Sequence, residues 1–214
     1  MAETAAPVTL FGARYSVYVR IVLAVLGEKG VACGLVPVDV FAEDGLSADY
    51  LSRHPFGRIP AFEHDGFRLH ETSAIARYVD EAFPGPSLQP AGLRERARMN
   101  QIVAMLDNYA YRPMVWDVYV ERVLRAAEGA AADEARIAAG LSQARVFLDA
   151  LAALSGGSRR LAGPDLSLAD LHAAPIFDYF TQAPDGAAML GEFPALGEWW
   201  ERLRTRPSVA AALA

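Results

Sequence analysis

Short apolar segments alternate with longer helical ones over the first eighty positions of the chain. Two of the short segments have the length of buried strands, and two others flank Asp65-Gly66. That dipeptide is typical of a two-residue hairpin turn, which needs positive φ at both positions. Pro37 lies inside the second strand, so that strand is predicted at an edge of the sheet. The predicted order is β-α-β-α-β-β-α, over residues 8–11, 17–26, 35–40, 46–53, 61–64, 67–70 and 72–82.

Beyond residue 92 the pattern changes to long, alanine-rich helical segments. Residues 93–127 predict one long helix bent at Pro113, because proline removes a backbone donor and clashes with the preceding turn. Further helices are predicted over residues 133–154, 167–180 and 195–204, and from residue 207 onward. Residues 84–90 hold three prolines and indicate a stiff linker. The predicted division is an α/β domain over residues 1–84, a linker over 85–92 and an all-helical domain over 93–214.

Composition then limits the classes of function. The 214 residues are 53% apolar and 21% charged, which fits a folded chain with a sizeable core. A net charge of −6 argues against nucleic-acid and membrane-surface binding, and charged residues or proline interrupt the apolar stretches. Cys33 is the only cysteine, so no intrachain disulfide forms, and residues 1–7 lack the regions of a secretory signal. A cytoplasmic protein is expected.

Ser16 is the first candidate for chemistry, because it stands between the first strand and the helix predicted over residues 17–26. The simpler interpretation is that its hydroxyl caps this helix. Alternatively, the helix start holds an anion with its free N–H groups and positive dipole end, and the hydroxyl donates to a ligand thiolate. Lowering a thiol pKa by about two corresponds to roughly 2.7 kcal/mol, which is within reach of one charge-assisted hydrogen bond plus a dipole end.

Residues 54–60, with the sequence His-Pro-Phe-Gly-Arg-Ile-Pro, come directly before the predicted hairpin. A cis Ile59-Pro60 bond would turn the Ile59 backbone toward an extended peptide ligand. Only about 5–6% of such bonds are cis, so a strand-starting proline in the trans form is the simpler interpretation.

Glu71-Thr72-Ser73 precedes the third helix. One interpretation is that Thr72 or Ser73 caps it. The other is that the helix start and the Thr72 hydroxyl hold a ligand carboxylate while Glu71 pairs with an adjacent ammonium group. An amino-acid headgroup carries both a carboxylate and an ammonium group, and these residues would bind both.

The remaining motifs favour structure over chemistry. His64 and His70 fall on opposite faces of the predicted hairpin and the other histidines show no ligand spacing, so no metal site is expected. Ser167 and Asp170 have the spacing of a capping box. The long helix carries four aromatic residues that either pack in the core or form a wall of an apolar substrate pocket: Tyr109, Tyr111, Trp116 and Tyr119.

Taken in order, these segments resemble the cytosolic glutathione S-transferase family, in particular bacterial, serine-type members similar to the phi, delta and zeta classes. Residues 11–30 look like the family's first strand, loop and helix, and its catalytic serine falls on Ser16. Its Asn-Pro-x-Gly-x-Val-Pro motif corresponds to residues 54–60, and its Glu-Ser pair to residues 71–72. Its second-domain signature matches residues 163–170, so the resemblance covers nearly the whole chain.

The resemblance implies a thioredoxin-like N-terminal domain followed by an all-helical C-terminal domain, and a homodimer. It implies no tightly bound cofactor, glutathione as cosubstrate and a small, mostly apolar electrophile as second substrate. Ser16, or alternatively Tyr15, would serve the glutathione thiolate. The implied glutathione-binding residues are Arg58, Ile59, Pro60, Glu71 and Thr72. The implied second-substrate residues are Phe11, Arg14, Tyr15, Tyr109 and Trp116.

Several positions depart from the family pattern. Arg58 replaces a usual Gln or Lys but still suits a glutathione carboxylate, Thr72 keeps the hydroxyl of Ser, and His54 replaces Asn. Gly45 and Leu46 stand where some classes place basic residues, which leaves open what binds the glycine carboxylate. A glutathione-dependent isomerase, dehalogenase or peroxidase on the same fold, or a non-catalytic binding protein, stays open as an alternative.

Overall fold

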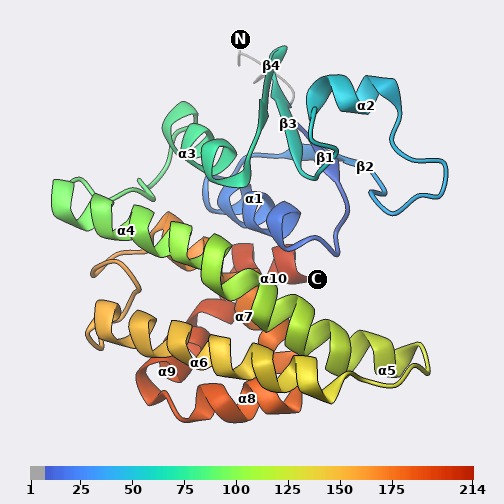
Figure 1. Cartoon of the computed structure of the whole chain (residues 1–214). Helices are drawn as coiled ribbons and strands as arrows, with labels where there is room; N and C mark the ends of the chain where they lie inside the picture. The colour runs from blue at the N-terminus through green and yellow to red at the C-terminus, as the bar shows by residue number, and fades with distance from the viewer. Residues whose placement is uncertain (1–7) are drawn as a thin grey trace. The chain divides into compact units, whose positions relative to one another are not determined.

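The structure is a computed structural model that describes residues 8–214. Residues 1–7, where the sequence argues against a secretory signal, lie outside the described residues. The chain divides into two compact units, of which the first ends at Ser87 and the second spans Leu88–Leu213 (Figure 1).

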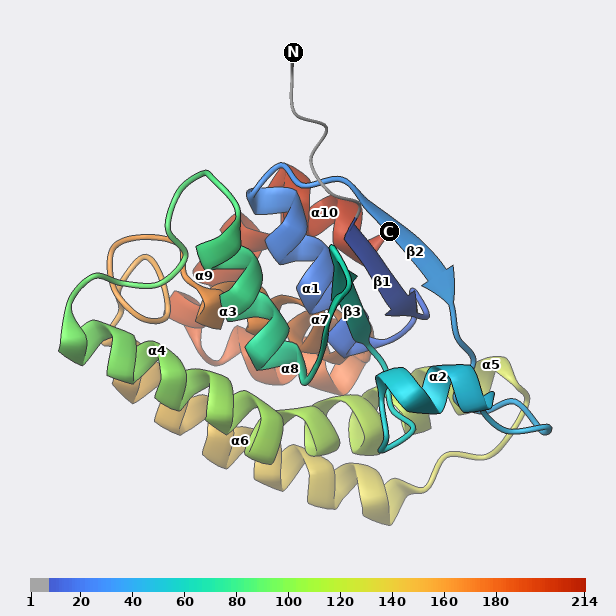
Figure 2. The same cartoon turned by 90° about the horizontal axis from the view of Figure 1, so that it is seen from above.

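The first unit is built on a four-stranded sheet with the strand order β2-β1-β3-β4. Its elements are β1 (Val8–Gly12), α1 (Val17–Glu28), β2 (Cys33–Pro37), α2 (Ala48–Arg53), β3 (Ala61–His64), β4 (Phe67–His70) and α3 (Thr72–Ala82). β1 pairs parallel with β2 and antiparallel with β3. Figures 1 and 2 show α1 and α3 on one side of the sheet and α2 on the other. This is the thioredoxin-like arrangement expected from the sequence.

Local signals in the sequence explain the hairpin and the edge of this sheet. Asp65 and Gly66 have φ values of 50° and 77°, as the two-residue turn requires. The resulting register points His64 and His70 to opposite faces. His64 contacts Tyr78 of α3, whereas the His70 ring lies against the ring of His54, the residue after α2. β2 is an edge strand, so its proline removes no ladder bond from the interior.

A buried ion pair fixes the C-terminal end of α1 in the first unit. The Lys29 Nζ donates to the Asp80 side chain at 3.1 Å, to the Asp80 carbonyl at 2.9 Å and to the Pro86 carbonyl at 3.1 Å. Both charged side chains are at most 3% exposed. The only lysine of the chain therefore joins α1 to α3 and to the segment that follows it.

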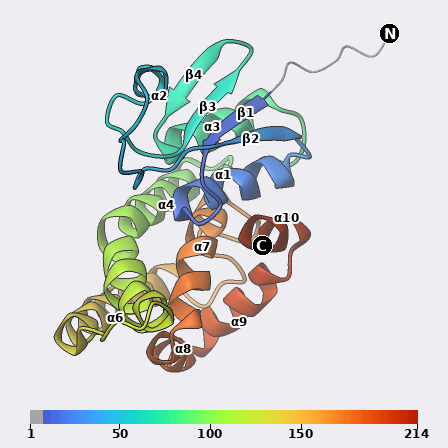
Figure 3. The same ribbon diagram turned by 90° about the vertical axis from the view of Figure 1, so that its right-hand side faces the viewer.

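The second unit is entirely helical within the described residues, apart from an isolated β-bridge. Its elements are α4 (Leu93–Met105), η1 (Leu106–Leu124), α5 (Arg125–Ala127), α6 (Glu134–Ser155), α7 (Leu168–Gln182), α8 (Pro184–Gly191), α9 (Pro194–Arg204) and α10 (Pro207–Leu213). The almost fully buried α7 is the central helix and packs against η1, α4, α8, α9 and α10 (Figure 3).

The predicted capping box starts α7 and does more than cap it. Asp170 is fully buried, and its Oδ2 accepts from the Ser167 N–H at 2.9 Å and from the Ser167 hydroxyl at 2.8 Å. Its Oδ1 accepts from the Leu161 N–H at 3.1 Å and from the Trp199 indole at 2.8 Å. One carboxylate therefore fixes the start of α7, the preceding loop and α9.

Two features of the second unit differ from the prediction. The helix over residues 93–127 is continuous, but η1 is a π-helix, in which the Arg125 N–H donates to Val120, five residues back. Pro113, which has no N–H to donate, is accommodated inside this wider helix. No helix is predicted from the sequence between residues 180 and 195, where the structure has α8. Pro184 begins this helix, and a Cβ at Gly186 would lie 2.1 Å from a carbonyl oxygen of α7.

By length and apolar composition, α6 is the one described helix that meets the criteria for crossing a membrane, and 33% of that stretch is buried. Core helices pass the same test. Phe147, Leu148 and Leu151 are buried, and α6 packs along η1 in the second unit. Its apolar face is therefore explained by packing within the helical unit.

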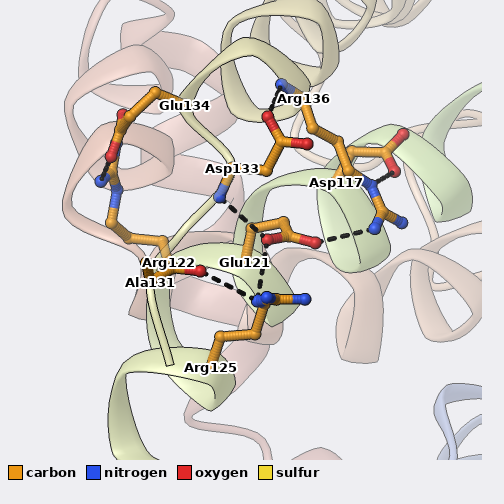
Figure 4. A network of polar contacts seen from close by, with 8 residues as sticks. All are labelled: Asp117, Glu121, Arg122, Arg125, Ala131, Asp133, Glu134 and Arg136. Atoms are coloured by element: carbon orange, nitrogen blue, oxygen red, sulfur yellow. Dashed lines mark hydrogen bonds and ion pairs between the residues drawn. The ribbon is translucent and has the colours of Figure 1, made fainter. Parts of the chain in front are cut away.

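A network of ion pairs joins η1 to α6 (Figure 4). Glu121 of η1 is 1% exposed and accepts from Arg136 at 2.7 Å and from the backbone N–H of Asp133 at 3.2 Å, and it pairs with Arg125 at 3.3 Å. Arg136 also donates to Asp117 at 2.7 Å. The network places two largely buried carboxylates against one guanidinium group, so its charges are mutually dependent.

Candidate functional site

Ser16 is the N-cap of α1, as the simpler interpretation of the sequence predicts. Its backbone is extended, with φ −74° and ψ 125°, and its Oγ accepts from the Val19 N–H at 3.4 Å. The Ser16 N–H donates to Ala13 at 3.0 Å and closes the turn after β1. A hydroxyl that accepts one hydrogen bond still has its own proton to donate. The cap and a thiolate donor are therefore compatible roles for this one hydroxyl.

Gly12 brings the start of α1 close to the segment before β3. A Cβ at this position would lie 2.5 Å from Val19 Cγ2 and 3.4 Å from the Ile59 Cβ. Only glycine allows β1 to end this close to both residues without displacing them. Gly12 therefore lies against the side chains of Ile59 and of Val19, the residue whose N–H the Ser16 hydroxyl accepts.

The Ile59-Pro60 peptide bond is cis, so the simpler trans interpretation is wrong here. Ile59 is nearly buried, and no hydrogen bond to its N–H or C=O is found within residues 8–214. The preceding turn is held by the buried Tyr50 hydroxyl, which donates to the Arg58 carbonyl. Burial raises the pKa of Tyr50 to about 12, so the hydroxyl keeps its proton. The Arg58 side chain is exposed, with no ion-pair partner in the described part of the chain.

α3 begins at Thr72, which is too early for Thr72 or Ser73 to be the residue that caps it. Glu71 occupies the N-cap position without a side-chain cap, so the capping interpretation of Thr72 and Ser73 is wrong. Glu71 has φ 70°, a conformation that costs a residue with a side chain about 1–3 kcal/mol. Among residues 8–214, the N–H groups of Thr72 and Ser73 find no backbone acceptor. The start of α3 therefore presents free donors beside the Thr72 hydroxyl and the exposed Glu71 carboxylate.

His54 lies behind these residues and was not foreseen as part of the site. Its ring is 3% exposed, lies 4.9 Å from the His70 ring, and its Nδ1 has no partner among the described residues. Burial, followed by the positive charges of His70 and Arg58, lowers the pKa of His54, and Glu71 opposes this effect. A neutral imidazole therefore stands within electrostatic range of Arg58 and Glu71. His54 and His70 lie on separate segments, and no sequence spacing signals their contact.

Tyr15, the alternative thiolate donor, is engaged elsewhere. Its ring is 48% exposed and stacks on Phe41 with 6.2 Å between centroids. Partial burial and a hydrogen bond to the Asp39 carboxylate raise the pKa of the Tyr15 hydroxyl. Asp39 competes with any thiolate for this proton, which favours Ser16 as the donor.

The first-unit residues expected to contact the second substrate lie near the same turn. The Phe11 ring is covered by the Arg53 guanidinium at 4.8 Å from its centroid. Arg14 is exposed, and its carbonyl accepts from Arg20 Nε at 2.7 Å. Phe11 is therefore partly committed to a contact with α2, whereas the Arg14 side chain is exposed.

The corresponding residues of the second unit lie on η1. Tyr109 is 64% exposed, and Trp116 donates from its indole to the Tyr111 hydroxyl at 2.9 Å. Tyr119, by contrast, is buried against Tyr179 with 4.4 Å between ring centroids. The four aromatic residues of this helix thus divide between core packing and accessible surface.

The fold and the site define a thioredoxin-like protein with an appended helical domain and open donors at two helix starts. Family models for the N-terminal and C-terminal domains of glutathione S-transferases match residues 10–87 and 100–207. The chain is 31% identical over 209 residues to the probable glutathione S-transferase GSTF1 of Oryza sativa subsp. japonica, covering 95% of this chain and 94% of the relative. The chain belongs to the cytosolic glutathione S-transferase family and is a transferase.

Solved structures agree with this assignment. Glutathione transferase F7 from Populus trichocarpa aligns with a TM-score of 0.83 and 31% identity over 97% of this chain and 99% of that one. A glutathione S-transferase I from maize in complex with an atrazine glutathione conjugate aligns with a TM-score of 0.84 and 28% identity over 97% and 98% of the two chains. The likeness extends across both units.

Proposed function

We propose that the chain conjugates glutathione to small, mostly apolar electrophiles, a detoxification reaction, and that Ser16 activates the glutathione thiol. The observation that carries this proposal is that Gly12 lies against the side chains of two residues: Val19, whose N–H the Ser16 hydroxyl caps, and Ile59, whose backbone groups are unpaired within residues 8–214. In this proposal, residues 1–84 form the glutathione-binding domain, 85–92 the linker and 93–214 the helical domain.

Glutathione would bind as an extended peptide along residue 59. Its cysteinyl backbone would pair with the N–H and C=O of Ile59, which Pro60 follows. Its γ-glutamyl carboxylate would accept from the Thr72 hydroxyl and from the free N–H groups at the start of α3, where the helix dipole favours an anion. Glu71 would pair with the γ-glutamyl ammonium group. The exposed Arg58 guanidinium suits a glutathione carboxylate and is unpaired among the described residues.

The reaction needs no covalent enzyme intermediate, because glutathione brings the nucleophile. The thiol releases its proton to solvent, the Ser16 hydroxyl donates to the resulting thiolate, and the sulfur attacks the electrophilic carbon. With a chloronitroaromatic substrate, the new carbon–sulfur bond forms and the carbon–chlorine bond breaks, with chloride as the leaving group. The chain contributes a lower thiol pKa and orientation of the two reactants.

The second substrate would contact Phe11, Arg14, Tyr15, Tyr109 and Trp116. The exposed ring of Tyr15, stacked on Phe41, offers an apolar surface beside the turn that carries Ser16. A panel of electrophiles, haloacids and peroxides tests the range of substrates and separates a conjugating enzyme from an isomerase, dehalogenase or peroxidase.

Retention on immobilised glutathione together with turnover of a chloronitroaromatic tests the function. The thiolate donor is tested by measuring the pKa of the bound thiol from its ultraviolet absorbance. Ser16→Ala should raise that pKa by about one to two, whereas Ser16→Thr should not, and Tyr15→Phe should leave it unchanged. A rise in Tyr15→Phe but not in Ser16→Ala would assign the role to Tyr15. Thr72→Ala should weaken glutathione binding, and unchanged affinity would refute the headgroup assignment.

Ser16→Asp separates the cap from the thiolate contact. Aspartate keeps the acceptor for the Val19 N–H, so the helix cap and the stability of the fold should be retained. An ionised carboxylate has no proton to donate and repels a thiolate, so activity should fall further than in Ser16→Ala. We also propose that the chain is a cytoplasmic homodimer, which sedimentation tests as twice the 23.1 kDa chain mass.

A further inference from the structure

Buried side-chain nitrogens without a hydrogen-bond partner fall into two groups within residues 8–214. One group belongs to Arg53 and His54, beside the proposed glutathione site. The other belongs to Arg160, Trp200 and Arg202 in the second unit, which the proposed function does not use. All nitrogens of the second group are obligatory donors, so they call for an acceptor. Buried donors without acceptors are costly, and their concentration in one place needs an explanation.

The loop after α6 and the helix α9 place these donors on neighbouring segments. Asp170 accepts both from Leu161 in the loop and from Trp199 on α9, and the Arg202 Nη2 donates to the Arg159 carbonyl at 3.5 Å. Figure 2 shows this orange loop beside α9. Arg160 and Arg202 therefore belong to one local surface, although 42 positions separate them along the chain.

Positive charge is in excess at this place. We call Arg159, Arg160, Arg202 and Arg206 the arginine cluster. Burial chiefly, followed by the charges of the other three members, lowers the pKa of Arg160, and only Asp170 opposes this effect. Both oxygens of Asp170 already accept hydrogen bonds from other groups. Arg160 itself is 9% exposed, and its buried Nη1 has no hydrogen-bond partner in the described part of the chain.

The neighbouring acidic residues do not accept hydrogen bonds from the unpartnered nitrogens of Arg160 and Arg202. Glu198 reaches only the Nη1 of Arg202, at 3.6 Å, and is 75% exposed. Glu201 pairs with Arg204, whose guanidinium lies over the ring of Trp200. The Nη1 of Arg160 and the Nε of Arg202 are left without an acceptor among the described residues.

We propose that the arginine cluster binds a phosphate-type oxyanion, with Arg160 Nη1 and Arg202 Nε as donors. Planar guanidinium groups match the geometry of phosphate oxygens. A dianion with several acceptor oxygens balances the cluster better than a single carboxylate does. The site is independent of glutathione, because none of its residues belongs to the proposed active site.

Isothermal titration with inorganic phosphate tests the site, with sodium chloride at equal ionic strength as the reference and acetate as the carboxylate probe. Phosphate should bind, and Arg160→Gln and Arg202→Gln should each weaken it at least tenfold. Arg94→Gln, which removes an equal charge from an exposed position of α4, should bind as the unmodified chain does. A phosphomonoester titrated in parallel shows whether the site prefers a free or a covalently attached phosphate.

The thermal midpoint of unfolding supplies a second readout, because Arg160→Met should affect stability differently with and without phosphate. Without phosphate, Arg160→Met should be at least as stable as the unmodified chain, because an unpaired buried charge is removed. With phosphate, the unmodified chain should gain stability and Arg160→Met should not. Equal stabilisation by phosphate and chloride, equal binding of acetate and phosphate, or unchanged phosphate binding in both glutamine variants would overturn the proposal.

Discussion

Glu121 at the centre of the η1–α6 ion network provides a direct test of how the helical unit is stabilised. Glu121→Gln keeps the shape of the side chain but removes its charge. The glutamate is 1% exposed and accepts from Arg136 at 2.7 Å and from the backbone of Asp133 at 3.2 Å. It also pairs with Arg125 at 3.3 Å. A glutamine retains one acceptor oxygen, and its amide group turns donors toward the positive side chains.

The magnitude follows from what is lost. A hydrogen bond to a charged group contributes about 1.5–3 kcal/mol, and removing one partner of a fully buried pair costs about 3–5 kcal/mol. Arg136 and Arg125 are 33% and 44% exposed, so water compensates part of the loss. We therefore expect Glu121→Gln to lower the free energy of unfolding by about 2–3 kcal/mol. For a chain of this size that corresponds to a fall of about 4–12 °C in the thermal midpoint.

Thermal unfolding followed by circular dichroism measures this change. Glu128→Gln is the matched control, because it removes the same charge from an exposed position just beyond α5. Arg136→Gln should also destabilise the unit, and the double variant should lose less than the sum of the two single effects, since both act on one interaction. If Glu121→Gln and Glu128→Gln had equal midpoints, the network would contribute nothing and the reasoning from burial would fail.

Three further predictions concern the first unit. Lys29→Met should lower the free energy of unfolding in urea by about 3 kcal/mol, since it removes the lysine partner of the buried Asp80 carboxylate, and adding Asp80→Asn should recover much of the loss. Gly12→Ala should cost about 1–3 kcal/mol through its clash with Val19, and a partner change Val19→Ala should reverse part of it. Because burial lowers the pKa of His54, the unfolded chain binds more protons below the ordinary value of about 6.5. Stability should therefore fall as the pH drops below about 6.5, with a shallower slope in His54→Asn.

Much of the fold could be predicted because its signals are local. The hairpin depends on Asp65-Gly66, which fixes the turn and with it the register of both strands. The long helix begins at residue 93 and ends at 127, as its apolar periodicity predicts. The π-helical middle could not be predicted, because the shift from fourth to fifth neighbours depends on packing around Pro113 and not on any single residue. The close contact of Gly186 with α7 could not be predicted either, because it joins separate segments and the sequence does not display it.

In the candidate site, too, the features with local sequence signals could be predicted and the others could not. Ser16 could be found because a strand, a short loop and a helix start follow each other in the sequence. Three other features could not be found in this way, because each is set by segments distant along the chain. They are the positive φ of Glu71, the cis bond before Pro60 and the contact between His54 and His70. Local chemistry favoured a cap by Thr72 or Ser73, and it failed where the backbone takes an uncommon conformation. Such conformations concentrate at functional sites, so this failure itself supports the site.

The two serines that begin α1 and α7 show why one helix start suits a ligand and the other does not. The Ser167 hydroxyl donates its proton to Asp170, three residues on, so that start is closed within the chain. At the same offset from Ser16 stands Val19, which offers only its backbone N–H to the serine oxygen and has no side-chain acceptor for the serine proton. Ser47 at the start of α2 also accepts only from a backbone N–H, but unlike Ser16 it is exposed. The proposed site therefore needs two features at once: the open Ser16 hydroxyl and the unpaired backbone groups of Ile59, whose side chain lies against Gly12.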